Sequence, residues 1–384
     1  MSRRQHSAPT LTRRHWLVLA TTGLAGCGGG GTSTAGAPGT GGTGNYAMYS
    51  QGSISGFGSV IVNGVKFDDV LATVQMDGIT ATPADLRLGM VAGVQGERGA
   101  DATLGTASHI EVWSVAQGVV SQVNGSEFTL AGMTVQTDSA TVFDTLGSAA
   151  QLAPGLRVAV WGLQAGTDGS HWKATRVALA SATVVVSSGM VVLQNGQRSL
   201  NNWLLTGAAV ANLAAGQLVR VQGTLLSDGR SLAVTSVKVL GAYIGTQPAG
   251  EIEIEGVVTA IPSASRLQLG SITVDTSSTV YSPPGASITP GARVEVYGSW
   301  QSGLLKATKV ELEDEHTLHA VEIEARIEQF TSLGNFVVRG QRCDARQATL
   351  SHGTAADLKV GVKVKVKGTK DGSDVLMVAE LEFE

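Results

Sequence analysis

A short acidic segment, residues 311–319, gathers side chains that ligate metal ions. It contains Glu313, Glu315, His316 and His319, and such carboxylates and imidazoles bind zinc, or calcium through the oxygens alone. The spacing matches no defined loop motif, and no glycine supplies the sharp turn of an EF-hand. Two interpretations follow: a metal site on these four residues, or a solvated acidic linker. We favour the linker and expect no bound cofactor.

Nucleophilic catalysis has little support in the sequence. The chain after its first forty residues contains no Gly-x-Ser-x-Gly elbow. Its histidines are scattered along that length: His109, His171, His316, His319 and His352. The one thiol of this region, Cys343, occupies a position where related segments carry Phe67 or Val135, so we expect a small core residue there. We therefore expect a protein that is not an enzyme.

Charged residues alternate along three expected strands, which would place each set on one strand face. The basic set is Lys363, Lys365 and Lys367, and the acidic sets are Glu251, Glu253 and Glu255, and Glu322 and Glu324. The functional interpretation is a patch for an anionic polymer or lipid headgroup. We favour a structural one, in which Glu322 and Glu324 lie beside the lysines on a paired strand.

Exposed aromatic rings could stack on sugars or bases. Trp161 and Tyr297 occupy matching places in two repeats, which is a hint of glycan binding. The other repeats carry Gln95, Gln222 and Lys367 there, so no repeated platform emerges.

The amino-terminal residues predict export and lipid attachment. Residues 1–26 contain four arginines, Arg3, Arg4, Arg13 and Arg14, followed by an apolar run. The run is too short to span a bilayer, which requires ~20 apolar residues. The run ends at Leu24-Ala25-Gly26-Cys27, which resembles the lipobox of bacterial lipoprotein signal peptides. The resemblance implies cleavage before Cys27 and attachment of palmitate-type acyl chains there; two or three chains anchor a protein firmly.

Two further features refine this localisation. Arg13 and Arg14 lie in Thr-Arg-Arg-His-Trp-Leu, which resembles a twin-arginine export motif, although the general route stays open. Gly28 follows the lipidated position, where the resemblance to Gram-negative lipoproteins favours the outer membrane, facing the periplasm or the cell surface. Residues 28–44, which contain only Gly, Ser, Thr, Ala and Pro, form a flexible linker of roughly 22 Å.

The net charge argues against one class of partner, and the cysteine content excludes an internal disulfide. The chain has 27 Lys and Arg against 31 Asp and Glu; removing the four arginines of the export segment leaves 23, a formal charge of −8. Nucleic acid needs a basic face, so we expect no nucleic-acid partner. One remaining cysteine excludes an internal disulfide.

The rest of the chain repeats one pattern five times: a glycine, six residues with alternating apolar side chains, and a second glycine. The leading glycines are Gly89, Gly155, Gly216, Gly291 and Gly361. Val158 and Val160, and their equivalents, should face a core. Each unit adds three earlier short strands and one later strand, which predicts all-β OB-like five-stranded barrels, with small β-sandwiches as the alternative.

The expected organisation is a signal peptide (1–27), a linker (28–44) and five repeats: 45–115, 116–182, 183–249, 250–316 and 317–384. The run Gly52–Val65 resembles the start of a bacterial repeat family of unknown function (number 5666), whose members are often lipoproteins. The resemblance is good in unit one, fair in units two and four, and weak in units three and five.

These observations predict a lipid-anchored envelope protein with a binding, spacer or scaffold role. Its expected partners are the membrane, through the lipid, and an envelope protein or glycan. The alternatives are a glycan- or peptidoglycan-binding lipoprotein and a metal-binding factor that uses residues 311–319.

Overall fold

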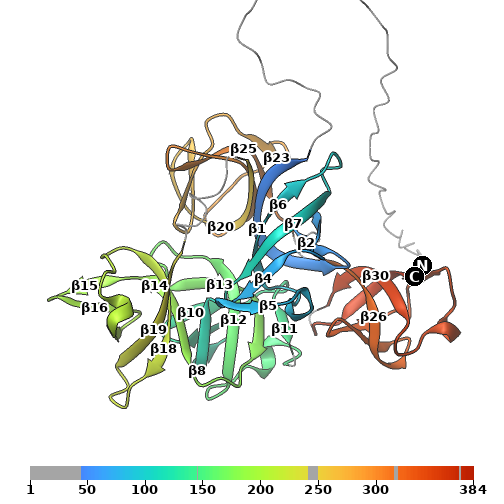
Figure 1. Cartoon of the computed structure of the whole chain (residues 1–384), viewed down its shortest axis with the longest axis horizontal. Helices are drawn as coiled ribbons and strands as arrows, with labels where there is room; N and C mark the ends of the chain where they lie inside the picture. Colours follow the sequence, from blue (N-terminus) through green and yellow to red (C-terminus); the bar gives the residue numbers. More distant parts are fainter. Residues whose placement is uncertain (1–44, 145, 241–249, 315–318, 372) are drawn as a thin grey trace, which may run out of the picture. The chain divides into compact units, whose positions relative to one another are not determined.

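The computed structural model describes residues 45–144, 146–240, 250–314, 319–371 and 373–384, and these residues form an all-β structure (Figure 1). Besides the strands, they contain single-turn 3₁₀ helices at Pro83–Asp85, Ala149–Gln151, Ala208–Val210 and Ala355–Asp357. Within these ranges no helix has the length and apolar character needed to cross a membrane.

The strands group into five sets in chain order. Barrel 1 contains β1 (Tyr46–Phe57), β2 (Val60–Val62), β3 (Val65–Asp68), β4 (Thr73–Met76), β5 (Ile79–Ala81), β6 (Val91–Arg98) and β7 (Leu104–Val112). Barrel 2 contains β8 (Ala116–Asn124), β9 (Glu127–Leu130), β10 (Met133–Gln136), β11 (Val142–Asp144), β12 (Arg157–Gln164) and β13 (His171–Leu179). Barrel 3 contains β14 (Val185–Met190), β15 (Val192–Gln194), β16 (Gln197–Leu200), β17 (Trp203–Thr206), β18 (Leu218–Leu225) and β19 (Ser231–Val239). Barrel 4 contains β20 (Glu251–Ser263), β21 (Arg266–Leu269), β22 (Ile272–Asp275), β23 (Val280–Ser282), β24 (Arg293–Gln301) and β25 (Leu304–Leu312). Barrel 5 contains β26 (Ala320–Ser332), β27 (Asn335–Val338), β28 (Gln341–Asp344), β29 (Thr349–Ser351), β30 (Lys363–Lys370) and β31 (Leu376–Phe383).

Each set closes on itself in the same order. In barrel 4, β20 pairs with β21, β21 with β22, β22 with β25 in parallel, β25 with β24, and β24 with β20. This ring, with its one parallel pairing between the third and last strands, is a five-stranded OB-type barrel. The predicted fold class is therefore confirmed, and the closed rings replace the alternative of small sandwiches.

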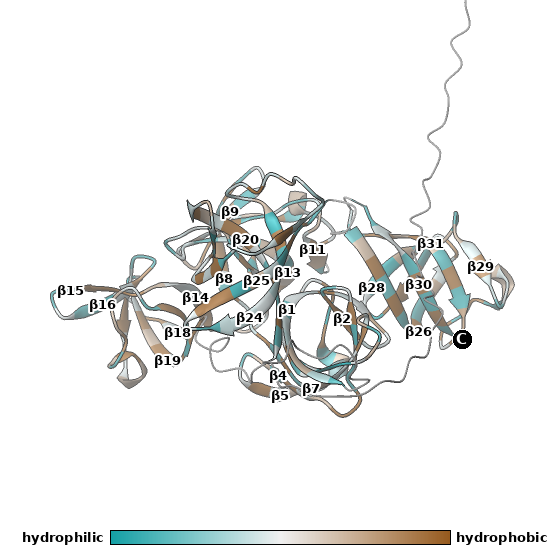
Figure 2. Cartoon of the chain, turned by 90° about the horizontal axis from the view of Figure 1, so that it is seen from above, coloured by the Kyte–Doolittle hydropathy of each residue, from teal (hydrophilic) through white to brown (hydrophobic). Residues whose placement is uncertain are grey.

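Every second side chain of these strands points into the barrel interior and fills it. Val158, Val160, Val364 and Val366 are each 0% exposed, as the pattern predicted. Lysine and valine alternate along β30 (Figure 2), because successive side chains in a strand point to opposite faces.

The two glycines of the repeated marker have different structural causes. The leading glycine has a positive φ in all five barrels, from 74° to 91°. The closing glycine lies at a β-bulge in the fourth strand; in barrel 2 the register shifts between Trp161 and Gly162. There a Cβ would lie 2.4 Å from the carbonyl oxygen of Lys173 on the paired strand. The marker therefore records one left-handed turn and one close backbone approach per barrel.

Barrel 1 contacts barrels that are remote in sequence. Its long strand β1 pairs in parallel with β20 of barrel 4, from Met48 opposite Glu251, and with β26 of barrel 5, where Gly56 lies opposite Glu322. Barrels 2 and 3 meet through β8 and β14. The residues from 43 to 384 form one compact unit. The barrels are therefore packed together, unlike separate beads on a string.

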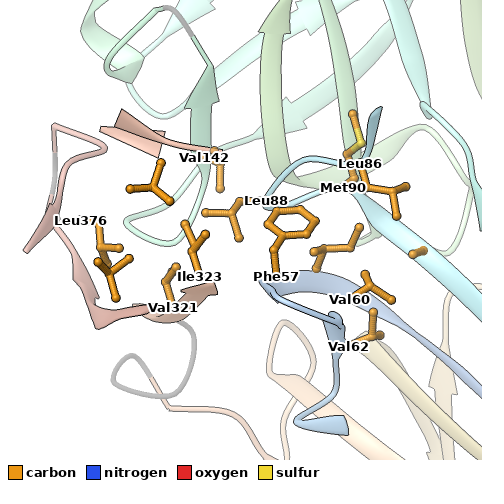
Figure 3. Close-up of a cluster of buried hydrophobic side chains, with 14 of the residues drawn as sticks. Phe57, Val60, Val62, Leu86, Leu88, Met90, Val142, Val321, Ile323 and Leu376 are labelled. Carbon is orange, nitrogen blue, oxygen red and sulfur yellow. The ribbon is translucent and has the colours of Figure 1, made fainter. Parts of the chain in front are cut away.

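The hydrophobic cores reflect this packing. One core joins barrels 1 and 5 and includes Phe57, Leu88 and Ile323, with Val142 of barrel 2 beside them (Figure 3). A second core is shared by barrels 2 and 3, and a third fills barrel 4 and includes Tyr49 of barrel 1.

Candidate functional site

Several residues singled out in the sequence lie outside the described residues: Leu24, Ala25, Gly26, Cys27, Arg13, Arg14, Glu315 and His316. Of the proposed metal ligands, His319 is placed with its Nδ1 3.3 Å from the carbonyl oxygen of Lys370 and its Nε2 3.1 Å from Ser139 Oγ. Glu313 lines a cavity beside Arg293 instead. No group of three acidic, histidine or cysteine side chains within the described ranges is arranged to hold a metal ion.

One histidine has a serine and a carboxylate nearby. His171 Nδ1 lies 3.0 Å from Ser170 Oγ and 3.4 Å from Asp168 Oδ1, and Ser170 Oγ donates to Asp168 Oδ2 over 2.7 Å. A catalytic triad requires serine and carboxylate on opposite nitrogens of the imidazole. Here one nitrogen faces both groups on an exposed turn, so the arrangement organises the hairpin between β12 and β13.

The charge stripes pair as the sequence predicted. Glu322 lies opposite Lys367, and Glu324 opposite Lys365, on the paired strands β26 and β30. Glu322 Oε1 is 3.3 Å from Lys365 Nζ and 2.6 Å from Nζ of Lys66, which belongs to barrel 1. Glu322 therefore also joins two barrels, a role that the sequence did not indicate.

Cys343 and Trp161 are both buried. Cys343 is 1% exposed, and burial raises the pKa of its thiol to about 12, which confirms a small core residue. Trp161 is 8% exposed, lies in the core of barrels 1 and 5, and has the Arg176 guanidinium 5.9 Å from its ring. It points away from its own barrel but is covered by another, so the expectation of an outward, exposed ring is wrong for Trp161.

The main candidate site is a pocket of about 160 Å³ between barrels 1, 2, 3 and 4. Strands β6, β12, β18 and β20 each contribute side chains or backbone to it. Its apolar wall includes Val91, Leu163, Leu218 and Ile254, and its polar groups include Gln51, Gln164, Glu111 and Lys238. No single barrel contains this pocket, because the packing of four barrels creates it.

A group of charged and aromatic side chains borders the pocket around Trp113. Lys238 Nζ of barrel 3 lies 4.0 Å from the centre of the Trp113 ring and 2.5 Å from Glu111 Oε2. Burial lowers the pKa of Lys238, and the hydrogen bond to Glu111 opposes that shift. This pair fixes β7, the last strand of barrel 1, against β19, the last strand of barrel 3.

A second cation contacts the same indole. Arg220 is 1% exposed, lies 5.0 Å from the Trp113 ring, and donates to Asp77 Oδ1 at 2.9 Å and to the Ser114 carbonyl oxygen at 2.6 Å. The Trp113 Nε1 donor is buried and has no hydrogen-bond partner among the described residues. The Trp113 ring is therefore contacted by two cations at the border of the pocket.

Sequence reasoning did not find this site. Trp113 and Lys238 come from different repeats, and their spacing along the chain carries no motif. The available signal was that Trp113 has no counterpart in the other repeats, which separates it from the repeated core positions.

The fold and the pocket define a class of protein: a tandem array of OB-type barrels with a ligand-sized pocket where the barrels meet. Three segments, residues 117–178, 255–311 and 324–380, match the family described as Domain of unknown function (DUF5666). They fall in barrels 2, 4 and 5, so the chain contains tandem repeats of this domain. The run Gly52–Val65, where the resemblance was clearest, lies outside these segments, and unit five matches although its resemblance was weak.

The other comparisons add little. No curated protein matches the chain. Among solved structures, the chain is similar to one titled drosophila Unr CSD456, at 10% identity, over 52% of this chain and 97% of that chain, with a TM-score of 0.14. A similarity at this level supports no conclusion about fold or function.

Proposed function

We propose that the protein is a non-catalytic, lipid-anchored envelope protein that binds a small saccharide in the pocket between barrels 1–4. The observation that carries this proposal is the pocket itself, because four barrels contribute to it. Ligand sites are typically concave, mostly apolar and furnished with a few fixed polar groups, and this pocket has that composition.

The size and chemistry of the pocket favour a single ring with hydroxyl groups. A cavity of about 150 Å³ accommodates a benzene-sized molecule. Sugar rings present apolar C–H faces and hydroxyls that both donate and accept. Val91 and Leu218 would contact the C–H face, while the Gln51 and Gln164 amides would bind hydroxyls.

The sequence supports the cellular location. The basic start, the short apolar run and the lipobox ending at Cys27 are the grounds for export and acylation. A lipid anchor followed by the Gly-rich residues 28–44 would hold the barrels near the cell wall, either at the outer membrane or in the periplasm. A wall-derived saccharide would be within reach there.

Calorimetric titration of the full chain with N-acetylglucosamine and muropeptide fragments tests the proposal. Leu240→Trp, which fills the pocket, and Gln51→Ala, which removes an amide, should each weaken binding at least tenfold. Gln301→Ala, on an exposed hairpin of barrel 4, is the matched control and should bind normally. Absence of saccharide binding, or equal binding by Leu240→Trp, would refute the pocket as the site.

The shared sheets and cores of the barrels favour a second candidate, a stiff spacer. A spacer would keep its envelope phenotype in the Leu240→Trp variant. It would lose that phenotype when the distance is changed, for example by lengthening residues 28–44.

A further inference from the structure

Barrel 3 carries a row of apolar side chains on its outer face. Val192 on β15 lies opposite Ser199, which lies opposite Leu204 on β17. Leu204 in turn lies opposite Ser231, whose carbonyl oxygen accepts the Leu226 N–H over 2.8 Å. Residues that oppose one another on paired strands share a face of the sheet. Val192 is 54% exposed, Leu226 is 42% exposed and Leu204 is half-buried, so apolar surface runs from β15 to the end of β18.

The other barrels carry polar, charged or small residues at the same places. The pairing register gives the equivalents of Leu204 as Lys66, Thr134, Thr273 and Arg342. It gives the equivalents of Val192 as Gly56, Gln122, Ala260 and Gln329. Closing an OB-type barrel therefore does not require large apolar residues on this face. In barrel 3 they indicate a surface that a partner covers.

The strand that borders this row is an unprotected sheet edge. β15 is the last strand of its sheet, pairs with β16 among the described strands, and has all three of its residues exposed. Natural edge strands are protected by charged residues or proline, and the corresponding segments of barrels 4 and 5 carry Pro262 and Glu328. β15 has neither. Arg198, which lies opposite Leu193, donates to the Leu213 carbonyl oxygen over 2.8 Å and is therefore held within barrel 3.

Barrel 1 shows what this face accepts. Gly56, the equivalent of Val192, lies opposite Ile61 on one side and opposite Glu322 of β26 on the other. Lys66, the equivalent of Leu204, forms an ion pair with the same Glu322 at 2.6 Å. In barrel 1, this edge and this face therefore receive a strand from another OB-type barrel. Among the described strands β15 pairs with β16 alone, so in barrel 3 the equivalent edge is open to a barrel from outside this chain.

We propose that barrel 3 binds barrel 3 of a second copy of this chain. The first strands of the other barrels already pair with one another: β1 with β20 and β26, and β8 with β14. A two-fold axis would set β15 antiparallel to its copy, as in other symmetric dimers. β15 is uncharged, so its copy brings no like charge to the contact. Backbone hydrogen bonds along β15 and burial of Val192, Leu193 and Leu226 would hold the dimer together.

Cysteine cross-linking of the full chain in the cell envelope tests this proposal. Two copies with different epitope tags are co-expressed, so that a product containing both copies is recognised. Leu193→Cys, at the centre of β15, should give a disulfide-linked product with both tags after mild oxidation. Ile261→Cys is the matched control and should not, because Ile261 follows Ala260 as Leu193 follows Val192 and is similarly exposed, 39% against 47%. Wild type, whose Cys343 is 1% exposed, gives the background.

Light scattering of the purified chain supplies the second measurement, in a Cys27→Ser background so that acyl chains contribute nothing. Leu193→Asp should weaken dimerisation at least tenfold, because two like charges meet at the axis. Its urea midpoint should stay that of wild type, since Leu193 is exposed. Ile261→Asp should dimerise as wild type does.

Four results would overturn the proposal. They are a monomeric wild type, equal cross-linking at both cysteines, unchanged dimerisation of Leu193→Asp, and a Leu193→Cys product that lacks the second tag. The last result would assign the face to a different envelope protein. The pocket around Trp113 contains none of the substituted residues, so saccharide titration of the same variants separates this surface from that pocket.

Discussion

Replacement of the closing glycine of one barrel by alanine should destabilise that barrel severely. In barrel 2 the closing glycine is Gly162, whose Cβ would lie 2.4 Å from the carbonyl oxygen of Lys173 and 3.1 Å from its carbonyl carbon. Those atoms belong to the paired strand, so they cannot move aside as a flexible side chain would. Either the bulge opens or the strands separate.

The same barrel supplies comparisons that fix the magnitude. Overpacking typically costs 1–3 kcal/mol, and we expect Gly162→Ala to cost about 3 kcal/mol because backbone is the obstacle. Gly155 has φ 91° with no atom within 4 Å of a Cβ, so Gly155→Ala should cost about 1–2 kcal/mol through backbone strain alone. At Gly118 a Cβ would lie 3.7 Å from Leu130, and Gly118→Ala should be neutral or stabilising by about 0.5 kcal/mol.

Urea unfolding followed by tryptophan fluorescence gives the free-energy differences, and amide hydrogen exchange assigns the loss to peptides of barrel 2. The expected order of stability is Gly118→Ala, then Gly155→Ala, then Gly162→Ala. If Gly162→Ala matched Gly118→Ala, the bulge would not explain the glycine, and the account of the repeated marker would fail.

Three further outcomes are expected. The thiol of Cys343 should react with Ellman's reagent only at the rate of unfolding, because its pKa is raised to about 12 and it is buried; immediate labelling of native protein would contradict this. Burial raises the pKa of Glu295 to about 10, so native Glu295 keeps a proton that the unfolded chain releases, and stability should fall as pH rises between about 4.5 and 10. The advantage of Glu295→Gln over wild type in urea midpoint should therefore grow from pH 5 to pH 9, and a constant difference would count against the raised pKa. Finally, Cys27→Ser should abolish radiolabelled palmitate incorporation and membrane retention, and unchanged retention would rule out the anchor.

The fold was predictable because every barrel repeats the same pattern of inward apolar residues, one turn glycine and one bulge glycine. Alternation identified the inward residues such as Val158 and Val294, and both are fully buried. The paired glycines marked one turn and one bulge per unit. The pairing of Glu322 with Lys365 followed from the strand order of an OB-type barrel.

The arrangement of the barrels was not predictable from those patterns. From the sequence, a residue that faces away from its own barrel is expected to be exposed. Trp161 shows why this fails, because it joins a core that is formed mainly by barrels 1 and 5. The pocket around Trp113 depends on the same contacts between barrels. Alternation determines which side of a strand a residue occupies, but it does not reveal what covers that side.

The long strand β1 has a consequence for biosynthesis. It is synthesised before the other described strands, yet Met48 pairs with Glu251 and Gly56 with Glu322. One edge of β1 therefore stays unpaired until β20 and β26 have been translated. A nascent chain with such late closure is prone to misassembly during synthesis. Export by the twin-arginine route, which transports folded proteins, would let the barrels assemble before the chain crosses the membrane.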